Sequence, residues 1–480
     1  MTWPESARTD KDEARTTRTP LASVCRLLVA GTSSQLRRNT LAGALSAVAG
    51  ALIAAISYPV YLHYLGYEQY GVWLAVAIVL SFAQFGNLGL APAVATKVAE
   101  DFARRDFPTI QVTVSTALLT LTAVGLLAVA GVLLFGGYIV GAMRLSPALA
   151  GQAHALLPFV ALLSLYVVQI ETVNAVLVGL GRLDLSVATQ VVSRALSLAV
   201  SASLLAGGVG VMSLPIANLA AYVFLHLASL ALARRITGHG ILALRGFDFA
   251  RLRELATFGS GVLACSIVNL LLGPLNKFAL TRYAGAGSVP VYELAWSLSM
   301  QLRGVLESGF RSLMPEVSRL ATLGSSESSM RIANVNRRAI KLIFAVGLPA
   351  FALVFAVATP VLRLWLGARF RPEIVPALRV LLAGCFLSLL GVPGYYTLLG
   401  LGRIKLVIAS QVVQAGTNGG IILVMGLLSG MASTGLTSAA AAAGMAAGGM
   451  YCLFIGIARP RLVENPDTLQ RETYAQEVTD

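Results

Sequence analysis

The sequence is built from successive apolar runs of about 20 residues or more, separated by short connections that carry most of the charges. A helix rises about 1.5 Å per residue, so such a run crosses the hydrocarbon core of a bilayer, which is about 30 Å thick. Hydrophobic residues make up 56% of the 480 residues and charged residues only 12%, which excludes a soluble globular fold. The runs also lack the apolar and polar alternation of an outer-membrane barrel. We therefore predict an all-α integral membrane protein.

Twelve runs qualify as membrane-spanning helices, six in each half of the chain. In the first half they lie near residues 41–65, 70–90, 110–140, 155–180, 185–205 and 211–233. In the second half they lie near residues 255–281, 289–313, 339–358, 376–399, 404–428 and 434–458. The predicted organisation is an N-terminal tail (1–40), a first six-helix lobe (41–233), a linker (234–254), a second six-helix lobe (255–458) and a C-terminal tail (459–480).

The basic residues indicate the orientation of the chain. The formal net charge is +14, but the Lys and Arg residues lie between the apolar runs and form no basic domain, which argues against nucleic acid as a partner. Most of them follow the second, sixth and eighth runs, and loops rich in Lys and Arg stay in the cytoplasm. We therefore expect a multi-pass protein of the bacterial inner membrane with both termini in the cytoplasm. The residues that depart from this pattern are Arg363, Arg369 and Arg371.

A sequence repeat relates the two halves. The segment GLGRLDLSVATQVV at residues 179–192 recurs as GLGRIKLVIASQVV at residues 400–413, with nine of fourteen positions identical and an offset of 221 residues. A weaker match in nearly the same register pairs Gly66 with Gly285. We expect each GLGR segment to form a tight helical hairpin, because glycine permits the turn and arginine contacts lipid headgroups. Since many transporters consist of duplicated bundles, we predict two homologous six-helix bundles around a central cavity.

The sequence gives little support to cofactor chemistry. The four cysteines and four histidines are isolated from one another, so no metal site can be proposed. The chain has no GxxxxGK[ST] phosphate-binding loop, which argues against an ATP-driven exporter. The loops assigned to the outside have no carboxylate pair, which argues against a membrane glycosyltransferase or polymerase. We predict neither a cofactor nor an enzymatic activity.

Several segments resemble one transporter family. The sequences YLGYEQYGVW at 64–73, FGNLGLAPAV at 85–94 and LMPEVSRL at 313–320 are similar to segments of the polysaccharide transporters, the O-antigen flippases, of the multidrug/oligosaccharidyl-lipid/polysaccharide exporter superfamily. The resemblance implies a two-lobe bundle that moves an undecaprenyl-pyrophosphate-linked oligosaccharide from the inner to the outer leaflet for surface polysaccharide assembly. It also implies membrane lipids, a polysaccharide polymerase and glycosyltransferases as partners.

Basic residues at membrane depth are the first candidates for binding such a substrate, because an ionisable group there is costly unless it is paired or hydrated. Arg194 and Arg303 lie near the middle of their spans, whereas Lys277 and Arg379 lie toward the outer ends. A guanidinium group can donate two parallel hydrogen bonds to phosphate oxygens. The alternatives are an ion pair between Arg303 and Glu307, one helical turn apart, and snorkelling of Lys277 and Arg379 to the interface.

Acidic residues form a second set of candidates. Glu171 and Asn174 are three residues apart in one span, and Glu293 and Glu307 lie in another. These side chains are candidates for binding a coupling ion. They are equally candidates for pairing with a basic residue, such as Glu171 with Arg194, because a buried carboxylate favours a basic partner.

Amide side chains lie along two further spans. Asn269 and Asn276 share one expected helix, and Gln411, Gln414 and Asn418 share another. We assign Asn269 and Asn276 to substrate binding, since amides hydrogen-bond to sugar hydroxyls. The alternative is hydrogen bonding between helices, which is the commoner use of amides in membrane bundles.

A cation-coupled multidrug antiporter of the same superfamily is the main alternative function, because it would share the helical frame and differ in its cavity. Basic groups in the cavity favour a pyrophosphate, and unpaired carboxylates favour cationic drugs. The four basic candidates outnumber the acidic ones, which are Glu171, Glu293 and Glu307. These charges are not duplicated between the halves, so we expect a chemically asymmetric cavity.

Overall fold

The computed structural model describes residues 34–242, 246–311, 313–321, 326–428 and 433–458. This part of the chain consists of α-helices with short 3-10 and π-helical turns, and it contains no β-strand. The predicted all-α class is therefore confirmed. The two predicted tails lie largely outside the described residues.

The helices of the first half follow the predicted spans. They are α2 (Ser34–Val76), α3 (Ile78–Ala103), α4 (Phe107–Ala142), α5 (Pro147–Gly179), α6 (Leu183–Ala206) and α7 (Ser213–Thr237), with the 3-10 turn η1 (Gly210–Met212) before α7. Helix α2 is broken at Gly66, whose φ is 67°. Glycine adopts this left-handed conformation at low cost. The residues of α2 after this break begin the second predicted span.

The second half contains more and shorter helices. They are α8 (Phe249–Ala284), η2 (Ala286–Ser288), α9 (Val289–Ser308), α10 (Leu313–Ala321), α11 (Ser326–Leu342), η3 (Ile343–Gly347), α12 (Leu348–Leu366), η4 (Gly367–Arg369), α13 (Ile374–Leu390), α14 (Val392–Gly400), α15 (Ile404–Leu428), α16 (Thr434–Leu453) and η5 (Phe454–Ala458). The span predicted at 376–399 is divided between α13 and α14 by Gly391.

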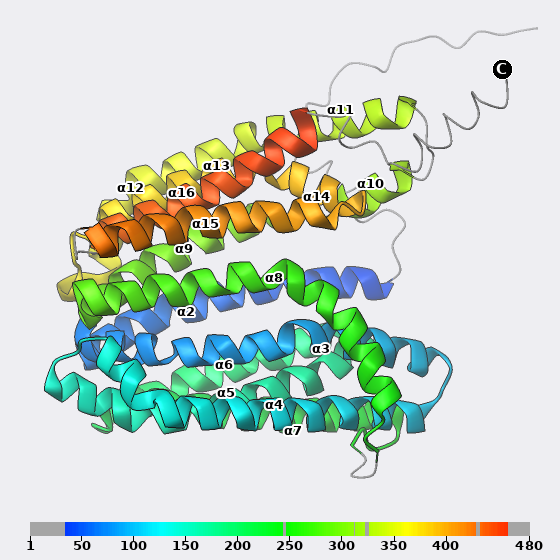
Figure 1. The fold of residues 1–480 in the computed structure, drawn as a ribbon, viewed down its shortest axis with the longest axis horizontal. Coiled ribbons are helices and arrows are strands. Elements are labelled where there is room, and N and C mark those ends of the chain that lie inside the picture. Colours follow the sequence, from blue (N-terminus) through cyan, green and yellow to red (C-terminus); the bar gives the residue numbers. More distant parts are fainter. Residues whose placement is uncertain (1–33, 243–245, 312, 322–325, 429–432, 459–480) are drawn as a thin grey trace, which may run out of the picture.

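The helices form two lobes with two long helices between them (Figure 1). Helices α3 to α7 form the first lobe and α9 to α16 form the second, while α2 and α8 run along the boundary. The lobes approach each other at the end that contains η2 and the α12–α13 connection, and they diverge toward the end that contains α10 and α11 (Figure 1). We name these ends the junction end and the basic end.

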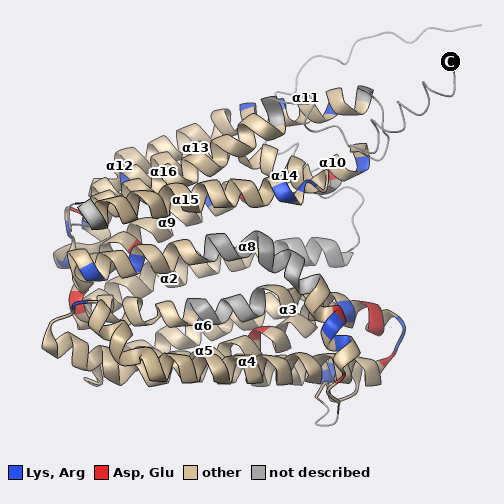
Figure 2. Cartoon of the chain, viewed as in Figure 1, with Lys and Arg blue, Asp and Glu red and all other residues tan. Residues whose placement is uncertain are grey.

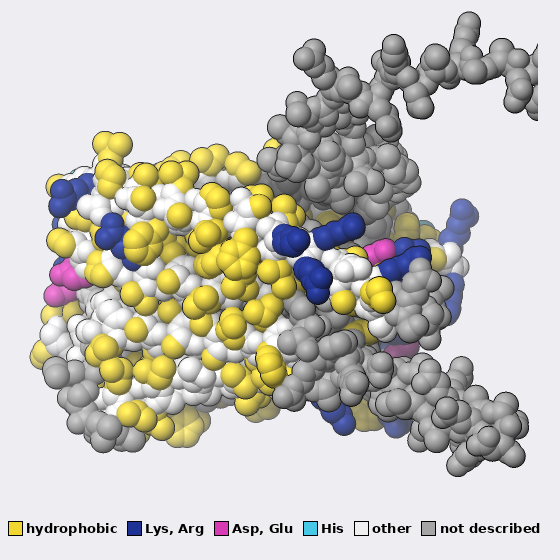
Figure 3. Space-filling view, turned by 90° about the horizontal axis from the view of Figure 1, so that it is seen from above, with side chains coloured by type: hydrophobic (Ala, Val, Ile, Leu, Met, Phe, Trp, Pro, Cys, Tyr) yellow, Lys and Arg dark blue, Asp and Glu magenta, His cyan; other side chains and the backbone are white. Residues whose placement is uncertain are grey.

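The surface is that of a membrane protein. Within the described residues, nine helical segments are long and apolar enough to cross a bilayer, and the remaining three predicted spans correspond to α3, α8 and α9. Apolar side chains cover the middle of the molecule (Figure 3). Lys and Arg residues gather around the α3–α4 connection, α10 and the start of α15, which gives the basic end its name (Figure 2).

Helix α8 contacts both lobes. Near its start, Leu255 is buried in one apolar cluster with Val94 and Val98 of α3. Near its end, Asn276 accepts a hydrogen bond from Asn418 of α15 at 3.0 Å. Figure 1 shows the bend that lets one helix pass from one lobe to the other. The lobe boundary predicted between residues 254 and 255 falls inside this helix.

The repeated GLGR segments have the same local geometry. Gly181 has a φ of 74° and Gly402 a φ of 69°. The following arginines close equivalent turns, because Arg182 N donates to Leu177 O at 2.9 Å and Arg403 N donates to Leu398 O at 2.9 Å. Each segment joins two successive helices. The predicted tight hairpins are therefore confirmed in both halves.

Candidate functional site

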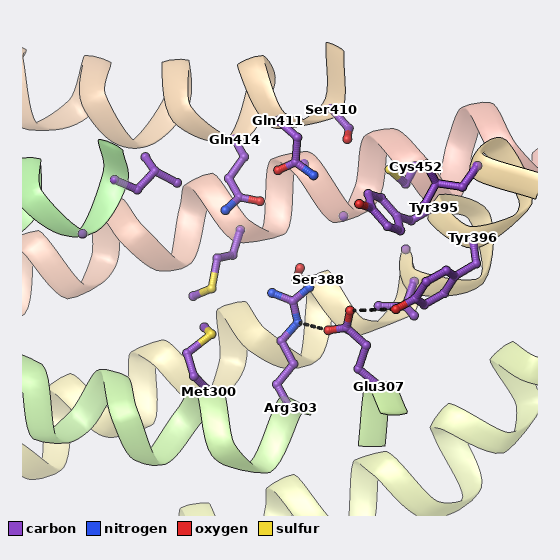
Figure 4. Close-up of a pocket in the computed structure, with 18 of the residues that line it drawn as sticks. Met300, Arg303, Glu307, Ser388, Tyr395, Tyr396, Ser410, Gln411, Gln414 and Cys452 are labelled. Carbon is purple, nitrogen blue, oxygen red and sulfur yellow. Dashed lines mark hydrogen bonds and ion pairs between the residues drawn. The ribbon is translucent and has the colours of Figure 1, made fainter. Parts of the chain in front are cut away.

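A polar cavity lies inside the second lobe (Figure 4). Its volume is about 400 Å³, and α8, α9, α13, α14, α15 and α16 line it. This volume falls in the range of small-ligand sites, about 300–1,000 Å³. The polar and charged residues that line the cavity are Arg303, Glu307, Ser388, Tyr395, Tyr396, Ser410, Gln411 and Gln414.

An ion pair on α9 provides the charges of the cavity. Arg303 Nε lies 3.3 Å from Glu307 Oε2, and the two side chains are 22% and 24% exposed. Tyr396 OH donates a hydrogen bond to Glu307 Oε1 at 3.4 Å (Figure 4). The contact of Arg303 is a charge contact, since its Nε has no aligned acceptor within the described residues. The guanidinium group therefore keeps hydrogen-bond donors for a ligand.

Amides of α15 form the opposite wall. Gln411 and Gln414 lie across the cavity from Arg303 (Figure 4). Gln411 Oε1 is buried and has no hydrogen-bond partner among the described residues. A buried polar atom without a partner is costly, so a polar ligand or water at this point would stabilise the site.

Glycines determine how closely the helices pack beside the cavity. Gly391 separates α13 from α14, and a methyl group at this position would overlap the carbonyl oxygen of Gly449 in α16. A methyl group at Gly394 would overlap the carbonyl oxygen of Cys452. The absence of side chains lets the helix backbones approach closely, as small residues do in membrane bundles. The interruption at Gly391 places the two tyrosines of α14 against the cavity.

Two of the predicted substrate-binding residues have partners outside the cavity. Lys277 Nζ lies 3.0 Å from Glu293 Oε2, which joins α8 to α9. Asn276 is fully buried, and its Nδ2 donates to Tyr292 OH at 2.8 Å. Its Oδ1 accepts from Asn418. The hydrogen bonds of Asn276 correspond to the helix-to-helix alternative for the amides, whereas Lys277 has an acidic partner on α9.

The remaining candidates of the second lobe lie elsewhere. Arg379 Nε donates to the carbonyl oxygen of Phe355 at 3.3 Å, and its guanidinium carbon lies 5.0 Å from the centre of that ring. Arg379 therefore packs against α12. The side chain of Asn269 lies outside the described residues. Among the predicted substrate-binding residues whose side chains the structure describes, Arg303 alone lines the cavity.

The charges of the first lobe are arranged differently. Arg194 of α6 and Glu171 of α5 are exposed and close enough to attract each other, but they form no direct ion pair within the described chain. Asn174 is buried, and its Oδ1 has no hydrogen-bond partner among the described residues. Glu171 and Asn174 therefore occupy different environments, although they share one helix.

Sequence reasoning missed the aromatic residues of the cavity. Tyr395 and Tyr396 line it together with Trp296. A signal was available in the sequence GVPGYYT at residues 391–397, because glycine and proline interrupt an apolar run there. In transporters, interrupted helices of this kind are pointers to binding sites.

Two of the arginines that depart from the cytoplasmic pattern, Arg369 and Arg371, join α2 to the second lobe at the junction end. Tyr67 OH donates to the carbonyl oxygen of Arg369 at 2.7 Å, and the guanidinium carbon of Arg371 lies 4.0 Å from the centre of the Tyr67 ring. Trp365 Nε1 donates to the carbonyl oxygen of Ala55 at 2.7 Å. These contacts connect α2 with the α12–α13 region, so the arginines have a packing role that orientation rules do not consider.

Comparison with models of protein families identifies the family of the chain. A profile described as "Polysaccharide biosynthesis protein" matches residues 36–321, which is more than half of the sequence. The chain belongs to this family. A comparison of this polysaccharide biosynthesis protein with curated protein sequences gives no match.

Solved transporter structures share the fold. The lipid II flippase MurJ in an inward closed conformation matches with a TM-score of 0.69 and 14% identity, over 87% of this chain and 86% of MurJ. An inward-facing multidrug resistance transporter of the MATE family matches with a TM-score of 0.68 and 15% identity, over 93% of this chain and 99% of the transporter. An outward-facing MATE transporter matches with a TM-score of 0.55 and 16% identity, over 93% of this chain and 97% of the transporter. At 14–16% identity these similarities show that the chain shares the fold of these proteins.

Proposed function

We propose that this polysaccharide biosynthesis protein moves an oligosaccharide linked to undecaprenyl pyrophosphate from the inner to the outer leaflet of the bacterial inner membrane. The observation that carries the proposal is the polar cavity around Arg303, which lies between membrane helices in a chain of this family. Transfer between leaflets breaks no covalent bond, so the protein needs no catalytic group.

The chemistry of the cavity fits the proposed substrate. The guanidinium group of Arg303 can donate to a pyrophosphate in competition with Glu307, since a phosphate accepts two parallel hydrogen bonds from arginine. Gln411 and Gln414 offer both donors and acceptors to sugar hydroxyls. The aromatic rings of Trp296 and Tyr395 add apolar faces to the same cavity.

The arrangement of the lobes supports alternating access. Direct contacts between α2 and the α12–α13 region close the junction end. The TM-score is higher for the inward-facing than for the outward-facing MATE structure, which supports an inward-facing state. We accordingly assign the basic end and both termini to the cytoplasm. Rocking of the two lobes would then open the junction end to the periplasm.

The test uses a transport assay in liposomes with fluorescent undecaprenyl-pyrophosphate oligosaccharide, together with surface polymer measured in cells. We expect Arg303→Ala to lower the flipping rate at least about tenfold, because a lost charge-assisted hydrogen bond to phosphate costs about 1.5–3 kcal/mol. Removal of Arg303 also leaves the carboxylate of Glu307 without its basic partner. The variant Glu307→Gln therefore accompanies it, alone and combined with Arg303→Ala.

Arg235→Ala, an exposed arginine at the end of α7, is the control and should transport at the wild-type rate. Normal flipping by Arg303→Ala at normal protein abundance would exclude this site. If Arg303→Ala transports normally but Glu307→Gln loses proton- or sodium-driven export of cationic dyes, the chain is an antiporter instead.

A further inference from the structure

A second hollow lies at the junction end, far from the cavity of the second lobe. Its volume is about 760 Å³, and both lobes line it. Glu68 of α2 and the α4–α5 connection contribute from the first half of the chain. The second half contributes η2, the α12–α13 connection and the start of α16. Because the lining comes from both lobes, separation of the lobes at this end would dismantle the hollow.

Four charged side chains line this hollow without neutralising one another. Glu68 and Arg144 come from the first half of the chain, and Arg371 and Glu373 come from the second. None of the four forms an ion pair within the part of the chain that the structure describes. The stacking of Arg371 on Tyr67 fixes its position and leaves its N–H donors available.

The charged groups converge on one open surface. A methyl group at Gly287 would lie 3.6 Å from Glu68 Cγ and 3.7 Å from Arg371 Nη1, so a side chain of α2 and one of the second lobe approach the same glycine. Ser146 and Glu373 occupy the N-cap positions of α5 and α13, and neither side chain caps its helix. Their polar atoms are thus available to a ligand.

The balance of charges determines the ligand class. An anion such as phosphate would be attracted by the two arginines and repelled to a similar extent by the two carboxylates. A sugar uses both kinds of group, because each hydroxyl both donates and accepts hydrogen bonds. We propose that this hollow binds a short neutral glycan from the aqueous side at the junction end. This inference rests on the proposed function, under which the oligosaccharide of the lipid-linked substrate emerges at that end.

A glycan in this hollow would regulate transport. It would contact Arg144 in one lobe and Glu373 in the other, so it binds only while the lobes meet at the junction end. A ligand that binds one of two states shifts the population toward that state. A glycan bound at the junction end, including one still linked to its lipid, therefore slows the opening of that end and inhibits further transport.

The test measures binding to the full chain in nanodiscs. The probe is a pool of short glycans prepared by acid hydrolysis of the producing cell's own surface polysaccharide. We expect saturable binding in calorimetry and a rise in Tm of about 2–4 °C at saturation. Arg144→Gln and Glu373→Gln should each raise the Kd about tenfold, whereas Arg235→Gln at the basic end should leave it unchanged.

Inorganic phosphate and glycylglycine serve as the competing probes. Absence of saturable binding of the glycan pool overturns the proposal. Tighter binding of phosphate or of the dipeptide overturns it as well, since the hollow would then be a site for an anion or a zwitterion. Glycan binding in a protein that flips no lipid-linked oligosaccharide would refute the proposed function alone. Normal flipping without glycan binding would refute only the proposal that the hollow binds a glycan.

Discussion

The two lobes share their turns and differ in their interiors. Gly179 of the first GLGR segment packs so closely on α3 that a methyl group would lie 2.6 Å from Ala95 O. Gly400 packs in the same way on α10, where a methyl group would lie 2.8 Å from Met314 O. The duplicated glycines therefore make duplicated helix contacts. Sequence identity in the repeat reflects a packing requirement that both lobes retain.

The helix that leads into each turn shows the difference. In the first lobe α5 is continuous from Pro147 to Gly179, whereas its counterpart in the second lobe is interrupted at Gly391. The repeat offset aligns Gly391 with Ile170, which is fully buried in α5. A buried isoleucine fills space in one lobe, whereas in the other a glycine packs against the backbone of α16 at the point where the helix is interrupted. The two lobes thus keep the same GLGR turns, and the cavity of the second lobe lies where the two copies of the repeat differ.

The largest expected effect comes from copying the residue of the first lobe into the second. Gly391→Ile would force a branched side chain into the carbonyl oxygen of Gly449, and overpacking of this kind costs about 1–3 kcal/mol or more. We expect a marked loss of folded protein in size-exclusion chromatography and a lower Tm. Gly420→Ile on α15, where an added side chain meets open space, is the control. Equal yields of the two variants would contradict the packing explanation.

A second prediction concerns the charges of the first lobe. Arg194→Ala should lower the flipping rate less than Arg303→Ala, because Arg194 is exposed and lies outside the cavity. We expect a decrease of a few fold, measured in the same liposome assay, and partial recovery with Arg194→Lys. If Arg194→Ala is the more damaging of the two, the substrate site lies in the first lobe and the asymmetry is reversed.

A third prediction tests the equivalence of the turns. Gly181→Ala and Gly402→Ala place a methyl group at a positive φ, which costs about 1–2 kcal/mol for a residue other than glycine. Both variants should lower the Tm by similar amounts. Gly207→Ala, at a glycine with a φ of −77°, should have a smaller effect. Unequal shifts for the two turns would show that their surroundings differ in ways that the hydrogen bonds do not reveal.

The smallest effect is expected at the basic end, where α8 meets the first lobe. A hydrogen bond from Lys97 lowers the pKa of Glu254, and the same contact raises the pKa of Lys97. The side chains of Lys97 and Glu254 are 17% and 41% exposed, and a pair that solvent reaches in this way contributes about 1 kcal/mol or less. Its contribution is present above the ordinary glutamate pKa of about 4.3 and disappears as the pH falls through the lowered value.

The measurement compares Tm values of the wild type and Lys97→Ala at neutral pH and near pH 3. The difference should be present at neutral pH and vanish in acid. Arg235→Ala, which changes an exposed arginine at the end of α7, is the control and should show the same small difference in Tm at both pH values. A pH-independent difference for Lys97→Ala would exclude a role for the charge of Glu254.

The sequence by itself determined the membrane class, the number and approximate limits of the spans and the repeat. Apolar runs, the density of charges and the GLGR segments are local properties, so they can be seen along the chain. The prediction that Arg303 could pair with Glu307 was equally local, because residues four apart in a helix are neighbours. The structure confirms that pair.

Only the tertiary structure decided which polar residues face a cavity. Lys277 pairs with Glu293 of the next helix, and Asn276 binds Asn418 across a separation of 142 residues. Such partners depend on how helices pack, and no spacing in the sequence encodes them. The same reason explains Arg369 and Arg371, which depart from the predicted orientation pattern and contact Tyr67 of α2, about 300 residues earlier in the chain.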